Sequence, residues 1–182
     1  MPRGVRATFA LAVALALLAA FLLGSALAGG MGAASARSAS TTLDLGVFDE
    51  LNQIRTQHGL KPLSLSGGLE LAAQTHSSEM LANGYFAHNS SNGSPFWKRI
   101  EAYYPAGRFG YWSVGENLYW SSGPTSATAA LKAWMASPEH RANILDPTWR
   151  QIGIAAASSP DAAGTYAGLG VTVITTDFGV RR

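Results

Sequence analysis

The chain has 182 residues, 13 Lys+Arg against 11 Asp+Glu, and no cysteine. The absence of cysteine excludes a disulfide scaffold, a lipoprotein anchor, cysteine-based zinc sites and a thiol nucleophile. Arg3 and Arg6 account for the whole excess of positive charge, so the chain from Arg37 onward is formally neutral. A neutral domain lacks the clustered basic face of nucleic-acid-binding proteins, and we exclude that class of function.

The first residues have the pattern of a secretory signal peptide. Arg3 and Arg6 precede an apolar run over 9–23, and small-residue A-x-A cleavage sites follow at 26–28 and 34–36. Cleavage would release a secreted protein, extracellular or periplasmic. The alternative is an uncleaved anchor, because the apolar run is nearly long enough to span a bilayer. In that case only this segment would contact the membrane.

Composition divides the chain into three parts. Residues 1–28 form the predicted signal peptide, which extends to residue 36 if the second site is used. Residues 29–42 are rich in Gly, Ala, Ser and Thr and predict a flexible linker. Residues 43–182 remain for one folded domain, which is long enough to bury its own core.

Amphipathic periodicity predicts two helices at the start of the domain, over 43–59 and 68–84. Gly59 and Gly84 are expected to end them. The faces expected to point inward are Val47, Phe48, Leu51, Ile54 and His58 in the first helix, and Leu69, Ala72, Ala73, His76 and Met80 in the second.

Two further helices and a short one are predicted downstream. Ser94 is expected as the N-cap of a helix with Pro95 in its first position. The helix over 125–137 must end near Pro138. Ser137 is then the expected N-cap of the short helix that follows. The inward residues of the longer helix are expected to be Ala127, Ala130, Leu131 and Trp134.

The C-terminal part changes to the alternation of strands. Apolar and polar residues alternate over 149–157 and again over 165–179, with Ser, Pro, Asp and Gly between the two runs, which predicts a hairpin. Residues 114–120 are a further strand candidate. Helices followed by an antiparallel hairpin predict an α+β fold built in layers.

Glu116 is the residue of the strand candidate that needs an explanation. It stands among apolar side chains in "SVGENLYW", where a carboxylate is costly unless something pairs with it. His58 and His76 are interpreted as helix residues with one hydrogen bond each. His88 and His140 lie at the ends of elements and are the candidate partners of Glu116. The sequence contains no H-E-x-x-H, no nucleophile elbow and no phosphate loop.

The segments "YFAH", "GENL", "SPEHRANIL…IGI" and "DFG" resemble the CAP superfamily, which comprises the cysteine-rich secretory, antigen 5 and pathogenesis-related proteins with an SCP domain. The bacterial branch is the most similar, and the resemblance covers about residues 45–178. It implies an α/β/α sandwich, with helices on both faces of a short antiparallel sheet.

The resemblance also implies a central cleft lined by two histidines and two acidic residues. The matching positions of this sequence are His88, Glu116 and His140, while the second acidic position falls on Ser137. Glu139 is close to Ser137 but would point about 100° away from His140 on a helix. Glu116 is expected to accept hydrogen bonds from the histidines, to stay ionised and to raise their pKa values.

Three functions follow from these expectations. The resemblance implies a secreted module that binds a lipid, a peptide or a cell-envelope component and requires no cofactor. The alternative is a metal-dependent hydrolase with His88, Glu116 and His140 as zinc ligands, although Ser137 removes the best candidate for a general base. A buried network with a purely structural role is the third interpretation. Aromatic residues expected near the cleft are Phe86, Trp97, Tyr103, Tyr104 and Trp112.

Overall fold

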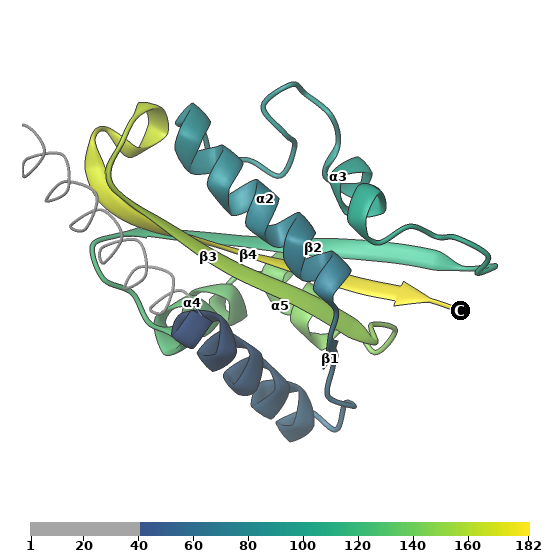
Figure 1. Cartoon of the computed structure of the whole chain (residues 1–182). Coiled ribbons are helices and arrows are strands. Elements are labelled where there is room, and N and C mark those ends of the chain that lie inside the picture. The colour runs from purple at the N-terminus through teal and green to yellow at the C-terminus, as the bar shows by residue number, and fades with distance from the viewer. Residues whose placement is uncertain (1–40) are drawn as a thin grey trace, which may run out of the picture. The chain divides into compact units, whose positions relative to one another are not determined.

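The structure is a computed structural model that describes residues 41–182 (Figure 1). The predicted signal peptide and most of the predicted linker lie outside the described residues. Residues 41 and 42, which we assigned to the linker, are already helical. The first turn is tied to the sheet, because the carboxylate of Asp44 accepts a hydrogen bond of 2.7 Å from the backbone N–H of Ala156.

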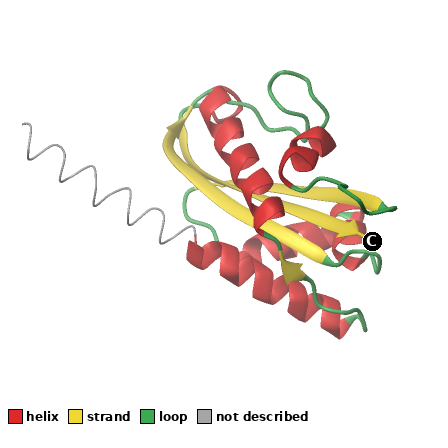
Figure 2. Cartoon of the chain, turned by 45° about the vertical axis from the view of Figure 1, so that its right-hand side comes forward, coloured by secondary structure: helices red, strands yellow, loops and turns green. Residues whose placement is uncertain are grey.

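Most helices precede the C-terminal hairpin in the chain, and Figure 2 shows helices on either side of the strands. After the first helix, over 41–57, come β1 (Ser64–Leu65), α2 (Gly67–Asn83), α3 (Phe96–Tyr103), β2 (Trp112–Ser122), α4 (Ala127–Ala136), α5 (Pro138–Leu145), β3 (Gln151–Ala162), the 3-10 turn η1 (Gly164–Tyr166) and β4 (Leu169–Arg181).

The strands form a sheet in the order β1-β3-β4-β2. Strand β4 pairs antiparallel with both β3 and β2, which confirms the predicted hairpin and the predicted strand around Glu116. Strand β1 runs parallel to β3 and pairs with it over only two residues. It was not predicted, because two residues carry no alternation. Strand β2 is therefore an edge strand of the sheet.

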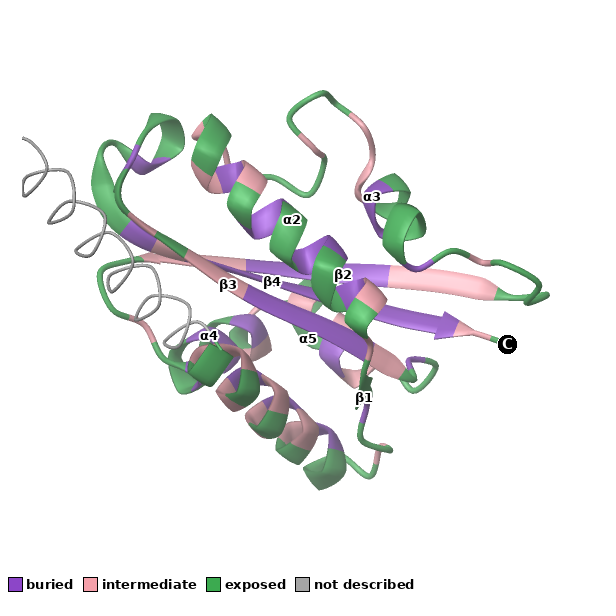
Figure 3. Cartoon of the chain, in the orientation of Figure 1, coloured by how far each residue is buried: buried purple, intermediate pink, exposed green. Residues whose placement is uncertain are grey.

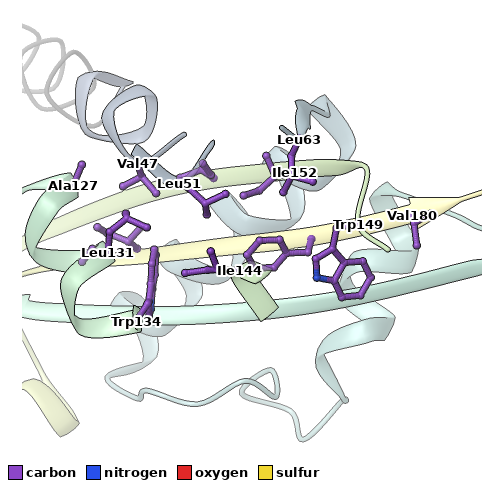
Figure 4. Close-up of a cluster of buried hydrophobic side chains, with 14 residues drawn as sticks. Val47, Leu51, Leu63, Ala127, Leu131, Trp134, Ile144, Trp149, Ile152 and Val180 are labelled. Carbon is purple, nitrogen blue, oxygen red and sulfur yellow. The ribbon is translucent and has the colours of Figure 1, made fainter. Parts of the chain in front are cut away.

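Helices cover both faces of the sheet, and the expected α/β/α sandwich is confirmed (Figure 1). The first helix, α4 and α5 pack on one face around a hydrophobic cluster that includes Leu51, Trp134 and Ile144 (Figure 4). Helices α2 and α3 cover the other face, and the middle of the sheet is buried between the two layers (Figure 3).

The helix ends agree with the expected signals to within one or two residues. Gly59 and Gly84 have positive φ angles of 72° and 65° and follow the first two helices. Ser137 is the N-cap of α5 and Pro138 its first residue, as predicted. Pro95 differs: it occupies the N-cap position of α3 rather than the first helical position, because its ψ of 146° is extended.

Within residues 41–182, no helix combines the length and the apolar character needed to cross a membrane.

Candidate functional site

The Gly-Glu-Asn segment of β2 sends successive side chains to opposite faces of the sheet. A Cβ on Gly115 would lie 2.9 Å from Asn143 Oδ1, so glycine lets α5 approach the strand. On this α5 side, Asn117 Nδ2 donates to the carbonyl oxygen of His140 over 3.0 Å, and Asn143 Nδ2 donates to Asn117 Oδ1 over 3.0 Å. The Glu116 side chain therefore points the other way, toward α2 and α3.

Glu116 is the centre of a buried ionic network. Its side chain is 0% exposed. One carboxylate oxygen, Oε1, accepts a hydrogen bond of 2.8 Å from His88 Nδ1, and the other, Oε2, forms a salt bridge with the guanidinium of Arg99. Nε2 of His76, on α2, lies 4.0 Å from Oε1. A positive charge and an imidazole thus offset the cost of burying this carboxylate.

His88 joins this network to the surface. Its side chain is 50% exposed, although Glu116 below it is fully buried. Arg99 fixes the loop around His88 by donating to the His88 carbonyl oxygen over 3.3 Å and to Ser90 Oγ over 3.1 Å. The imidazole lies 6.3 Å, centre to centre, from the ring of Phe96. His88 is therefore an exposed imidazole held in place from below by buried charges.

His140 has a different partner from the one we expected. Its Nδ1 shares a hydrogen bond of 2.9 Å with Ser137 Oγ, and not with Glu116. Burial, followed by the charge of His88, lowers the pKa of His140, so the expectation that Glu116 raises it was wrong. Glu139, the substitute considered for Ser137, is exposed in the first turn of α5.

The remaining two histidines differ in their relation to the site. His76 is fully buried and donates from Nε2 to the carbonyl oxygen of Ala87 over 2.9 Å. It makes the one hydrogen bond that we predicted, but it also lies against Glu116 and belongs to the network. Burial lowers its pKa, with Glu116 opposing the shift. His58 is exposed and donates to the carbonyl oxygen of Ile54 over 2.8 Å, away from the network.

Sequence reasoning missed two ionisable members of the network. Arg99 is buried on α3 and supplies the positive charge beside Glu116. Asp177 is fully buried on β4, directly opposite Glu116 in the pairing of β2 with β4. A charged residue beside Ile100 in "WKRIEAYY" and an aspartate inside the last strand were the available signals. Neither could be connected to Glu116 without the sheet register.

The predicted zinc site is not supported by the arrangement of the donors. Among residues 41–182, no group of three His, Cys, Asp or Glu side chains is placed to hold a metal ion. Glu116 Oε2 is paired with Arg99, and His140 Nδ1 with Ser137. In this arrangement His88, Glu116 and His140 are not grouped as three ligands of one ion.

The aromatic residues expected near the cleft fall into two groups. Trp97 and Tyr103 are 40% and 42% exposed on α3. Tyr104 is fully buried, Trp112 is half-buried and donates from Nε1 to the Tyr104 carbonyl oxygen over 2.8 Å, and Phe86 packs against the cluster around Met80. Trp97 and Tyr103 are thus the most exposed rings of the five, while Phe86 and Trp112 are partly exposed.

The sequence of the chain is similar to those of two bacterial proteins. Protein YkwD of Bacillus subtilis is 34% identical over 121 residues, which is 66% of this chain and 44% of that protein. The membrane protein YlbC of the same organism is 30% identical over 116 residues, which is 63% of this chain and 31% of that protein. This chain thus spans less than half the length of these two curated relatives.

Solved structures agree with the sequence comparison. An extracellular protein with an SCP domain from Bacillus anthracis has a TM-score of 0.62 and 25% identity, over 81% of this chain and 43% of that one. An outer surface protein from Borrelia burgdorferi has a TM-score of 0.54 and 20% identity, over 74% of this chain and 90% of that one, and shares the fold. The profile described as CAP, the cysteine-rich secretory protein family, matches residues 48–175, and the chain belongs to this family.

Proposed function

We propose that this CAP-domain protein is secreted and binds a lipid, a peptide or another component of the cell envelope at the surface around His88. The main support for the proposal is the difference in exposure between two hydrogen-bonded side chains, those of His88 and Glu116. The His88 side chain is 50% exposed, whereas that of Glu116, which fixes its imidazole, is 0% exposed. A network with a purely structural role needs no exposed imidazole.

The surroundings of His88 support binding. The charge of His88 contributes to the lowered pKa of His140, the second histidine that the family resemblance points to. The ring of Phe96 lies beside His88, and Trp97, the next residue of α3, is exposed. Imidazoles next to aromatic rings suit a ligand that combines hydrogen-bonding groups with an apolar face. The similarity to an extracellular SCP-domain protein and to a membrane protein supports a location at the cell envelope.

Hydrolysis assisted by a metal was the alternative function. It would require three protein ligands around an open position, and residues 41–182 contain no group of side chains placed in that way. The partial exposure of His88 favours binding, which is the function that we propose.

Calorimetric titration of the exported protein with cell-wall glycopeptide fragments and with lipid micelles tests this proposal. We expect saturable binding to one of these probes, weakened at least about tenfold in His88→Ala, which is the size expected for losing a hydrogen bond to a fixed polar group. His58→Ala is the matched control, because His58 is also an exposed histidine but lies outside the network. Absence of saturable binding, or an equal loss in both variants, would contradict the proposal.

A further inference from the structure

Asp177 is a buried acid that the proposed binding function does not use. It lies on β4 with Glu116 opposite on β2 and Gly153 opposite on β3. Directly opposite residues of antiparallel strands have Cβ atoms about 4.5–5.5 Å apart and share a face of the sheet. Gly153 contributes no side chain, and α2 closes this face, because a Cβ on Gly153 would lie 2.0 Å from the Leu69 backbone. Asp177 is therefore enclosed beside Glu116.

The ionisable groups around Asp177 come from four parts of the chain. Glu116 extends from β2 and Arg99 from α3, while α2 contributes His76 and, behind it, Glu79. His88 lies in the loop before α3, and its Nδ1 is 2.8 Å from Oε1 of Glu116. Arg99 is the cation of this group, and its Nη2 already binds Glu116.

Asp177 itself has no donor in reach. No hydrogen-bond donor of residues 41–182 contacts either of its carboxyl oxygens. As a carboxylate it would place a second negative charge next to Glu116, opposite a single guanidinium, in a region without exposure. Two adjacent buried carboxyl groups avoid this repulsion by keeping one proton between them.

We propose that Asp177 is an uncharged carboxylic acid at neutral pH and donates its proton to a carboxylate oxygen of Glu116. The pair then binds one proton and carries one negative charge, which matches the one positive charge of Arg99. Burial, followed by the charge of Glu116, raises the pKa of Asp177 well above its usual range, which supports the assignment. Asp177 thereby acts as a positioning residue for the carboxylate that holds His88. This inference does not depend on the proposed binding function.

Infrared spectroscopy of the exported protein tests where the proton lies. The carbonyl stretch of a protonated carboxyl group is separate from that of a carboxylate. Asp44 must be removed from the measurement, because burial raises its pKa to about 7, so the background is Asp44→Asn. At pH 7 we expect one protonated-carboxyl band that shifts on ¹³C-aspartate labelling and disappears on adding Asp177→Asn. Asp161→Asn is the matched control and should leave the band unchanged, because Asp161 is exposed.

Two results of the infrared measurement would overturn the proposal. The first is the absence of a protonated-carboxyl band at pH 7, and the second is a band that shifts with ¹³C-glutamate and not with ¹³C-aspartate. Labelling needs no substitution of Asp177, so the proposal stays testable if Asp177→Asn does not fold.

The pH dependence of unfolding gives a second test in the same background. The folded chain keeps a proton that the unfolded chain releases above about pH 4, so this group lowers the folded-to-unfolded ratio about tenfold per pH unit as pH rises from 5 to 7. The variant that also carries Asp177→Asn should lack this contribution. Identical pH slopes for the two proteins would show that Asp177 is ionised.

Discussion

The two faces of the sheet are covered in different ways. On the face of the first helix, α4 and α5, one continuous hydrophobic cluster extends from Val47 to Trp149 (Figure 4). On the face of α2 and α3, two smaller clusters form, around Met80 and around Leu69. The buried ion pair of Glu116 and Arg99, with Asp177 beside it, belongs to this second face. The difference indicates that the first face provides most of the packing and the second positions polar groups.

Each face also contains one buried arginine, and the two are satisfied differently. Arg55, on the first helix, donates from Nη1 to the carbonyl oxygens of Ile144 over 2.6 Å and Asp146 over 3.0 Å. Neutral backbone groups therefore satisfy it, and it ties the first helix to α5. Arg99 is paired with the Glu116 carboxylate. Arg55 thus joins two helices on the first face, whereas Arg99 neutralises a buried carboxylate on the second.

The largest expected effect tests the packing role of the first face. Trp134 is 1% exposed and donates from Nε1 to the carbonyl oxygen of Leu118 over 2.8 Å. Trp134→Ala should lower the free energy of unfolding by about 3–5 kcal/mol in urea melts, the range for removing a large buried aromatic side chain. Trp97→Ala, at an exposed tryptophan, serves as the control. A loss below about 1 kcal/mol in Trp134→Ala would mean that this cluster does not stabilise the fold.

Removing the cation of the second face should have a slightly smaller effect. Arg99→Met leaves the Glu116 carboxylate buried without its positive partner, and we expect the free energy of unfolding at pH 7 to fall by about 3 kcal/mol. Arg108→Met, at an exposed arginine, should change it by less than about 0.5 kcal/mol. Equal effects of the two substitutions would show that the second face contains no ionic network that depends on Arg99.

The smallest expected effect is the dependence of stability on pH that His76 contributes from the second face. Burial lowers the pKa of His76 below its usual 6.5, so below this pH the unfolded chain binds a proton that the folded chain does not. Stability from this group is complete above pH 6.5 and falls with decreasing pH, by up to about 1.4 kcal/mol per pH unit. In urea melts between pH 6.5 and 5, His76→Gln should lose less stability than the unchanged protein. His58→Gln, on the other layer, should behave like the unchanged protein.

Much of the fold can be predicted from the periodicity of apolar residues in the sequence. Part of the network can be predicted from the free-energy cost of burying a carboxylate. The apolar spacing of the helices and the alternation of β3 and β4 predicted the layers, because these patterns are local. Glu116 could be singled out because a carboxylate in an apolar strand needs partners. His88 and His140 could be singled out because they lie at the ends of elements, and the resemblance to the family points to the same two residues. The hydrogen bond between His88 and Glu116 joins residues that are 28 positions apart, a separation that no local pattern connects.

Asp177 and Arg99 could not be predicted as partners of Glu116, because their positions depend on strand pairing and helix packing between distant parts of the chain. Asp177 faces Glu116 only because β2 and β4 pair in one particular register, and a shift of one residue would turn either side chain to the other face. Arg99 reaches Glu116 only because α3 packs beside β2. His140 bonds to Ser137 within its own helix turn, and this short-range alternative competes with the expected long-range one.

The short β1 strand has a consequence for aggregation. Because β1 pairs with only two residues of β3, the outer edge of β3 continues beyond Ile152 without a strand beside it. An open edge with free N–H groups can pair with the edge of a second molecule. Here Asp44 accepts the N–H of Ala156. Farther along, the register of β3 shifts between Ser159 and Ala162, and Pro160 within this bulge has no N–H to donate. The bound N–H and the bulge both disfavour growth of the sheet from one molecule into the next.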